Sequence, residues 1–241
     1  MGRAPTRRAR CTVVDDRTRR RRIHRQALSI SLALAPFGIV FGVACVEAGL
    51  GIAEAVGFSA IVFTGSAQFA AVGVLGDGGG AIAAISAGLL LNIRSLAFGV
   101  LLAPSLTGRV GTRALLAQLV IDESTAVATV QDEPRWQRYG FLAGGIAVFA
   151  VWNLTTVAGV LLASVDDGFI TDLGFDAAAP AAFLALLWPR LVGDGGREGR
   201  RIAIAGGLVA AAAVPLTPPG IPILLAGLGV LAARTTRGVP S

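Results

Sequence analysis

The chain has 241 residues, of which 54% are hydrophobic and 15% are charged, and its mean hydropathy is +0.71. Soluble domains carry about 25% charged residues, so this composition excludes an ordinary water-soluble domain. The net charge of +6 would suggest nucleic acid in a soluble protein, but ten of the 21 basic residues, all of them arginine, lie before residue 26.

This arginine-rich start predicts a disordered cytoplasmic tail over residues 1–25 that fixes the orientation of the first span. The alternative is a patch that binds anionic lipid or nucleic acid. Nothing aromatic interleaves with the arginines, so nucleic acid is not expected as a partner.

Charge-free runs of about 20 residues, the length that crosses a bilayer, recur along the rest of the chain. They predict an all-α polytopic protein of the cell (inner or plasma) membrane, with one transmembrane domain over 26–235 and a short C-terminal tail over 236–241. The predicted spans cover 26–48, 54–75, 81–103, 114–131, 138–163, 176–193, 201–216 and 219–234. The last two are short and separated by VPLTPPGIP, so they form either two spans or one re-entrant hairpin. The total is therefore about eight spans, or seven.

The first span carries small residues on one face, which predicts close packing against another helix. These residues are Ser31, Ala35, Gly38, Gly42, Cys45 and Gly49.

The second span contains a polar interruption where lipid should meet only apolar groups. Thr64, Gly65, Ser66 and Gln68 fall within five consecutive residues. One reading is a broken helix that lines a substrate cavity, because irregular backbone in a membrane survives only inside protein or along a cavity. The other is helix packing through small residues, with Gln68 bonded to a neighbour.

The third span holds Asn92 and Arg94 near its middle. An arginine in the bilayer needs a carboxylate, backbone carbonyls or water. The alternative is that Arg94 lies near a membrane face and extends its guanidinium to water.

The fourth span has a polar stripe, since Gln118, Asp122, Thr125 and Thr129 share one helix face, with Glu123 beside them. This pattern predicts either a pore-lining helix, with a carboxylate that carries protons or pairs with Arg94, or an amphipathic helix on the membrane surface.

The fifth span adds Asn153 and Thr156 on one face. They can bond to another helix or contact substrate.

No cofactor or metal is expected. The chain has two cysteines, Cys11 and Cys45, and one histidine, His24, which do not make a ligand set for zinc or haem.

Five motifs in order resemble one family. They are Ala35-Pro36-Phe37-Gly38, FTGSAQF (63–69), Asn92-Ile93-Arg94, Asp122-Glu123-Ser124 and GFDAAAPAAFLALL (174–187). Over about residues 26–235 the chain looks like the AzlC-type large subunit of the two-component branched-chain amino-acid exporters.

The resemblance implies a secondary transporter, not an enzyme, which exports leucine, isoleucine, valine and sometimes methionine on the proton gradient. It also implies a small hydrophobic AzlD-like partner subunit. A zwitterion passing through would need polar groups such as Ser66, Gln68 and Asn92, while Phe63 and Phe69 could flank its apolar side chain.

Two other functions stay open. One is an intramembrane enzyme that uses Asp122 and Glu123, and the other is a non-transporting assembly subunit. We also predict that Arg94 pairs with Asp122 or Glu123, because these charges lie on adjacent central spans.

Overall fold

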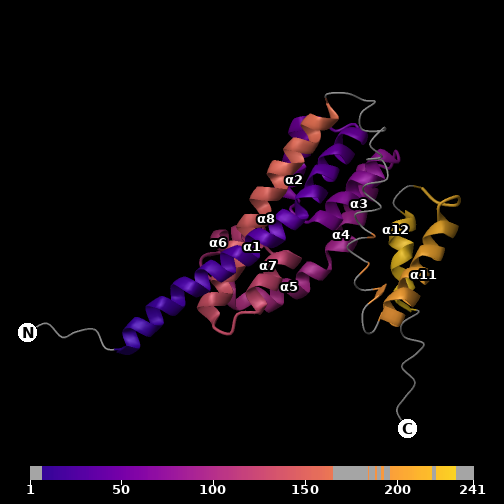
Figure 1. The fold of residues 1–241 in the computed structure, drawn as a ribbon. Helices are drawn as coiled ribbons and strands as arrows, with labels where there is room; N and C mark the ends of the chain where they lie inside the picture. The colour runs from indigo at the N-terminus through magenta and orange to yellow at the C-terminus, as the bar shows by residue number, and fades with distance from the viewer. Residues whose placement is uncertain are drawn as a thin grey trace, which may run out of the picture. The chain divides into compact units, whose positions relative to one another are not determined.

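The computed structural model describes residues 7–164, 196–218 and 221–231, together with the single positions 184, 188, 191 and 192. All regular secondary structure in these residues is helical, which confirms the all-α class. The chain divides into two compact units, residues 1–35 with 95–152 and residues 36–94 with 153–241, which are described one at a time. The two long helices α1 (Arg7–Glu47) and α8 (Pro134–Ala163), both labelled in Figure 1, each contribute residues to both units.

The first unit combines the first parts of α1 (Arg7–Glu47) and α8 (Pro134–Ala163) with the helices α5 (Arg94–Leu102), η1 (Ala103–Ser105), α6 (Val110–Ala117) and α7 (Asp122–Thr129). In its core, Ile23 packs with Val127 and Trp136. Glycines bring α8 close to α7, because a Cβ added to Gly140 would lie 2.8 Å from the Val127 carbonyl oxygen.

The second unit combines the remainders of α1 and α8 with the helices α2 (Ile52–Ile61), α3 (Gly65–Gly76), α4 (Ala81–Asn92), α11 (Gly196–Ala213), α12 (Ile221–Ala226) and η3 (Gly227–Val230). Helices α3 and α4 form a hairpin around an alanine-rich core. Helices α1 and α8 touch backbone to backbone, since any side chain at Gly42 or Gly159 would overlap the opposite helix. The predicted packing face of the first span is thus confirmed at Gly42.

Two described helices are long and apolar enough to cross a membrane, Asp16–Glu47 within α1 and Pro134–Ala163. The pair Ala81–Asn92 and Arg94–Ser105, bent by 46°, makes a third candidate span. The helices Ile52–Ile61, Gly65–Gly76 and Ile221–Val230 are apolar but shorter. The count of seven or eight spans and the cytoplasmic N-terminus stay predictions, and the segment 176–193 and the motif 174–187 lie almost entirely outside the described residues.

The structure is helical where the sequence predicted a disordered tail, because α1 begins at Arg7 and continues without a break into the first span. From Asp16 onward this helix has ion-pair partners at and just before the start of α8, namely Asp16 with Arg135 at 3.0 Å and Arg19 with Glu133 at 2.8 Å.

Candidate functional site

The polar interruption of the second predicted span is a break between two helices. Helix α2 ends at Ile61 and α3 begins at Gly65, with Thr64 extended at φ −160° and ψ 102° between them. The helix is thus broken immediately before Gly65, while a role of this break in a substrate path stays a prediction. A break of this kind exposes carbonyl groups at the end of one helix and N–H groups at the start of the next.

Gln68 provides hydrogen-bond donors for two of the carbonyl groups at the end of α2. Its side chain is fully buried, and its Nε2 donates to the carbonyl oxygen of Ser59 at 3.3 Å and, more weakly, to that of Phe58 at 3.5 Å. The first turn of α3 thereby holds the last turn of α2 across the break. The Oε1 atom of Gln68 is buried without a hydrogen-bond partner, so it is an acceptor facing the protein interior.

The second half of α8 contacts the same end of α2. The buried hydroxyls of Ser59 and Thr156 lie 3.2 Å apart. Asn153, one turn earlier on α8, is half-buried. The Phe69 ring is buried and lies edge-on against Phe41, with ring centroids 5.5 Å apart, and its role beside a substrate stays a prediction.

The third predicted span also breaks, at Ile93 between α4 and α5. Arg94 follows this bend, is exposed, and donates from Nη2 to the Ser66 hydroxyl at 2.8 Å. The structure thus brings together the two polar interruptions, in α3 and after α4, that the sequence placed on separate spans. Asp122 and Glu123 belong to the first unit, so their predicted pairing with Arg94 stays a prediction.

An apolar pocket of about 380 Å³ lies between α2, α3 and α4. Near the breaks it is lined by Val62, Ala67 and Asn92, and its walls are otherwise apolar apart from Glu54. Glu54 accepts a hydrogen bond from the Gly51 backbone N–H at 2.7 Å, which caps α2. The pocket therefore offers apolar walls, with the Asn92 amide beside the breaks.

The fourth predicted span is not one helix, which corrects the predicted continuous polar stripe. Helix α6 ends at Ala117 and α7 begins at Asp122, so Gln118 is separated from the other three stripe residues. The physical reason is local, since the Ser124 hydroxyl donates to the Leu119 carbonyl oxygen at 2.6 Å and holds the turn. Asp122 and Glu123 are half-buried in the first turn of α7, where carboxylates interact favourably with the helix dipole.

Two site residues escaped the sequence analysis. In the sequence, Ser59 is an isolated hydroxyl within an apolar run. Glu54 lines the pocket, and no sequence pattern indicates this position. Within the described residues, no group of three or more histidine, cysteine, aspartate or glutamate side chains is placed to hold a metal ion.

Comparisons with known proteins agree with the four motifs that lie between residues 35 and 124. The family model described as AzlC protein matches residues 29–165, which is more than half of the chain. The inner membrane protein YgaZ of Escherichia coli (strain K12) is 27% identical over 149 residues, which cover 58% of this chain and 59% of that relative. The chain thus spans about three fifths of the curated relative it matches. No solved structure matches it.

The matched range includes the α2–α3 break, Asn92, Arg94, Asp122, Glu123 and Asn153. The family match and the apolar helices together show that this is a membrane protein. The chain belongs to the AzlC family.

Proposed function

We propose that the chain is a secondary transporter of the cell membrane that exports branched-chain amino acids, namely leucine, isoleucine and valine, and sometimes methionine. The observation that carries the proposal is the α2–α3 break, which combines the buried Gln68 amide and the Arg94–Ser66 contact with an adjoining apolar pocket. An amino acid with an apolar side chain needs both features. Its charged groups need polar partners, because burying them without partners is costly, and its side chain needs an apolar surface.

The groups around the break suit the three parts of such a substrate. The carboxylate would bind the Arg94 guanidinium and the Ser66 hydroxyl, since arginine donates to carboxylates in a fixed fork. The ammonium would donate to the Asn92 side chain and the Gln68 Oε1 atom. The side chain would occupy the pocket between α2, α3 and α4. Thr64, Gly65 and Asn153 would line the same path.

The partner and the membrane are also proposals. The resemblance implies a small hydrophobic AzlD-like subunit that acts with this chain. The relative from E. coli is described as an inner membrane protein, and we propose the same location here. Exposed apolar side chains on α4 and α5, such as Ile82, Leu96 and Val100, suit contact with lipid or with such a subunit.

The proposal is tested by export from intact cells. Cells loaded with a valine-containing dipeptide release valine, and the release rate is compared with and without this gene and a small membrane partner. Ser66→Ala should slow release about tenfold, because a hydrogen bond to a charged group is lost. Ser86→Ala is the matched control, since the Ser86 hydroxyl donates only to the Ile82 carbonyl of its own helix. Equal release with and without the gene, in the presence of the partner, would refute the transport function.

Proton coupling is proposed to use Asp122 or Glu123, with Arg94 as a partner of one of them. A carboxylate that takes up and releases a proton couples transport to the gradient, and an amide cannot. Asp122→Asn should therefore abolish gradient-driven export, whereas Glu123→Gln should reduce it less. Release is measured at several external pH values, and unaltered pH dependence in both variants would remove the two residues from coupling.

A further inference from the structure

A cluster of aromatic and basic side chains lies where α1 meets the start of α8, in the first unit. The guanidinium carbons of Arg19 and Arg135 lie 5.1 and 5.0 Å from the centre of the Trp136 ring. That of Arg20 lies 5.9 Å from the Trp136 ring and 5.1 Å from the Tyr139 ring. We name these five residues the arginine–tryptophan cluster. Cation–π attraction holds each guanidinium over a ring, yet it leaves the positive charge unneutralised.

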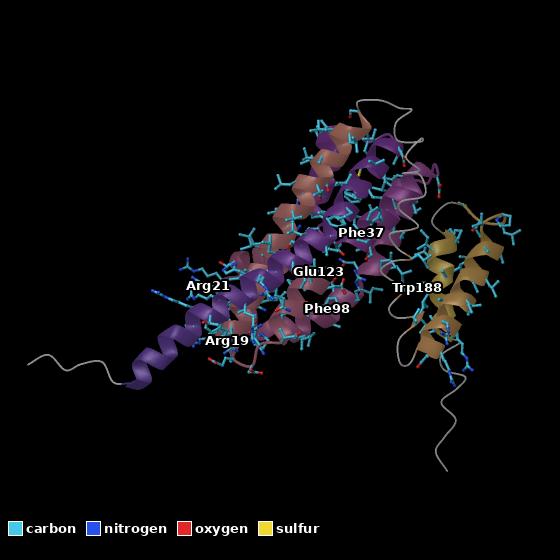
Figure 2. All side chains as sticks on the ribbon, viewed as in Figure 1. Arg19, Arg21, Phe37, Phe98, Glu123 and Trp188 are labelled. Atoms are coloured by element: carbon cyan, nitrogen blue, oxygen red, sulfur yellow. The ribbon has the colours of Figure 1, made fainter. Side chains whose placement is uncertain are left out.

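The surroundings of the arginine–tryptophan cluster are strongly basic. Residues 16–25 and 131–139 together hold eight arginines and three carboxylates. The ion pairs of Asp16 and Glu133 involve only Arg19 and Arg135, and Arg20 has no carboxylate partner among the described residues. Figure 2 shows the side chains that project from this stretch of α1, with Arg19 and Arg21 labelled. Close like charges on a helix repel, so a bound anion would stabilise this arrangement.

Two buried donors in the arginine–tryptophan cluster point to the kind of ligand. Trp136 is 3% exposed, and its Nε1–H has no acceptor. The Nε–H of Arg19 is also buried without an acceptor. Buried polar groups in folded proteins are almost always hydrogen-bonded, and both of these groups can only donate. An anion supplies acceptor oxygens of the kind that each of these donors lacks.

The position of the arginine–tryptophan cluster along the two helices indicates the source of that oxygen. Helix α1 is free of charged residues from Gln26 to Val46, and α8 is free of them from Tyr139 onward. His24 and Tyr139 share a 2.7 Å hydrogen bond, so both helices change from charged to apolar at the same level. Tryptophan and tyrosine mark the membrane–water interface in membrane proteins, which is also where lipid phosphates lie.

We propose that the arginine–tryptophan cluster binds the phosphodiester of an anionic phospholipid. Arg20 supplies the main charge, and the Nε–H groups of Arg19 and Trp136 donate to phosphate oxygens. The site anchors the N-terminal part of α1 to the start of α8 at the membrane surface. It does not depend on the transported substrate.

The test is lipid binding by the intact protein, freed of lipid in detergent and titrated with phosphatidylglycerol in a phosphatidylcholine background. Bound lipid is counted by native mass spectrometry. Arg20→Gln should weaken binding of phosphatidylglycerol at least about tenfold, because the charge-assisted contact between the Arg20 guanidinium and the phosphate is lost. Arg22→Gln is the matched control, since Arg22 is exposed on the same helix and is not one of the arginines found over the Trp136 ring. It should weaken binding at most about fivefold, the effect of one surface charge.

Trp136→Phe keeps an aromatic ring under the arginines but removes the Nε1–H, and should weaken binding about fivefold. Equal effects of Arg20→Gln and Arg22→Gln would overturn the site, because they would indicate diffuse attraction only. Competition by inorganic phosphate at equal concentration would overturn the lipid assignment in favour of free phosphate. If a single-stranded oligonucleotide bound instead, and the variants weakened its binding in the same order, the lipid assignment would be overturned in favour of nucleic acid.

Discussion

The α2–α3 break in the second unit and the α6–α7 break in the first both interrupt segments that the sequence predicts as single spans, but their polar groups are satisfied differently. At the α6–α7 break, the Ser124 hydroxyl donates to the carbonyl oxygen of Leu119, and the Thr125 hydroxyl donates to that of Ile121. These bonds all connect residues within six positions of one another. At the α2–α3 break, Gln68 reaches back to Ser59 on another helix, and Ser66 receives Arg94 from beyond α4.

The difference indicates which break can change shape. Local side-chain bonds close the α6–α7 turn whatever the neighbouring helices do. The α2–α3 break depends on contacts between helices, so its polar groups become available when those helices move. It also adjoins the apolar pocket through Val62 and Ala67. We therefore expect the α2–α3 break to serve transport and the backbone of the α6–α7 break to serve the fold.

The largest expected effect that tests this comparison comes from two buried glutamines. Gln68 spans the α2–α3 break, whereas Gln131, just after the end of α7, donates from Nε2 to the nearby Val127 carbonyl oxygen of α7 at 3.3 Å. Their exposed fractions are 0% and 2%, so leucine would replace either with a similar loss of polar contact. Each substitution should lower the free energy of unfolding by about 1–3 kcal/mol. Only Gln68→Leu should abolish export.

The measurements are thermal unfolding in detergent and valine export per folded molecule. Export that falls equally in Gln68→Leu and Gln131→Leu would mean that both losses reflect stability, and the special role of the α2–α3 break would be lost.

The sequence predicted one of these breaks and missed the other for a physical reason. A glycine and three polar residues lie within Thr64–Gln68, and their polar groups would be unsatisfied if they faced lipid, so a break was expected there. The 4-3-4 spacing of Gln118, Asp122, Thr125 and Thr129 fits a continuous helix, and the Ser124 bond that favours the turn exists only once the turn has formed. The contact between Arg94 and Ser66 joins positions 28 residues apart, so no local pattern reveals it.

A smaller effect sharpens the comparison at Gly65. The backbone of Gly65 does not lie in the left-handed region, so alanine fits its conformation. Gly65→Ala should stabilise the protein by about 0.4–1 kcal/mol, because the unfolded chain loses freedom. It should slow export several-fold if the break must flex during the transport cycle. Gly73→Ala, in the same helix with open space around its Cβ position, should be stabilising without slowing export. Equal export rates in the two variants would indicate that the α2–α3 break is rigid during transport.

The smallest expected effect on transport comes from the α6–α7 break. Ser124 is fully buried, and Ser124→Ala removes its bonds to the carbonyl oxygens of Leu119 and Ile121. The free energy of unfolding should fall by about 1–2 kcal/mol, because a turn of the chain loses its cap. Export per folded molecule should stay within about twofold of the original protein, because the substrate path does not use this turn. Ser59→Ala is the counterpart in the second unit, where loss of the 3.2 Å contact with Thr156 should reduce export. If Ser124→Ala instead stopped export at an unchanged melting temperature, the α6–α7 turn would itself move during transport, and the two breaks would share one role.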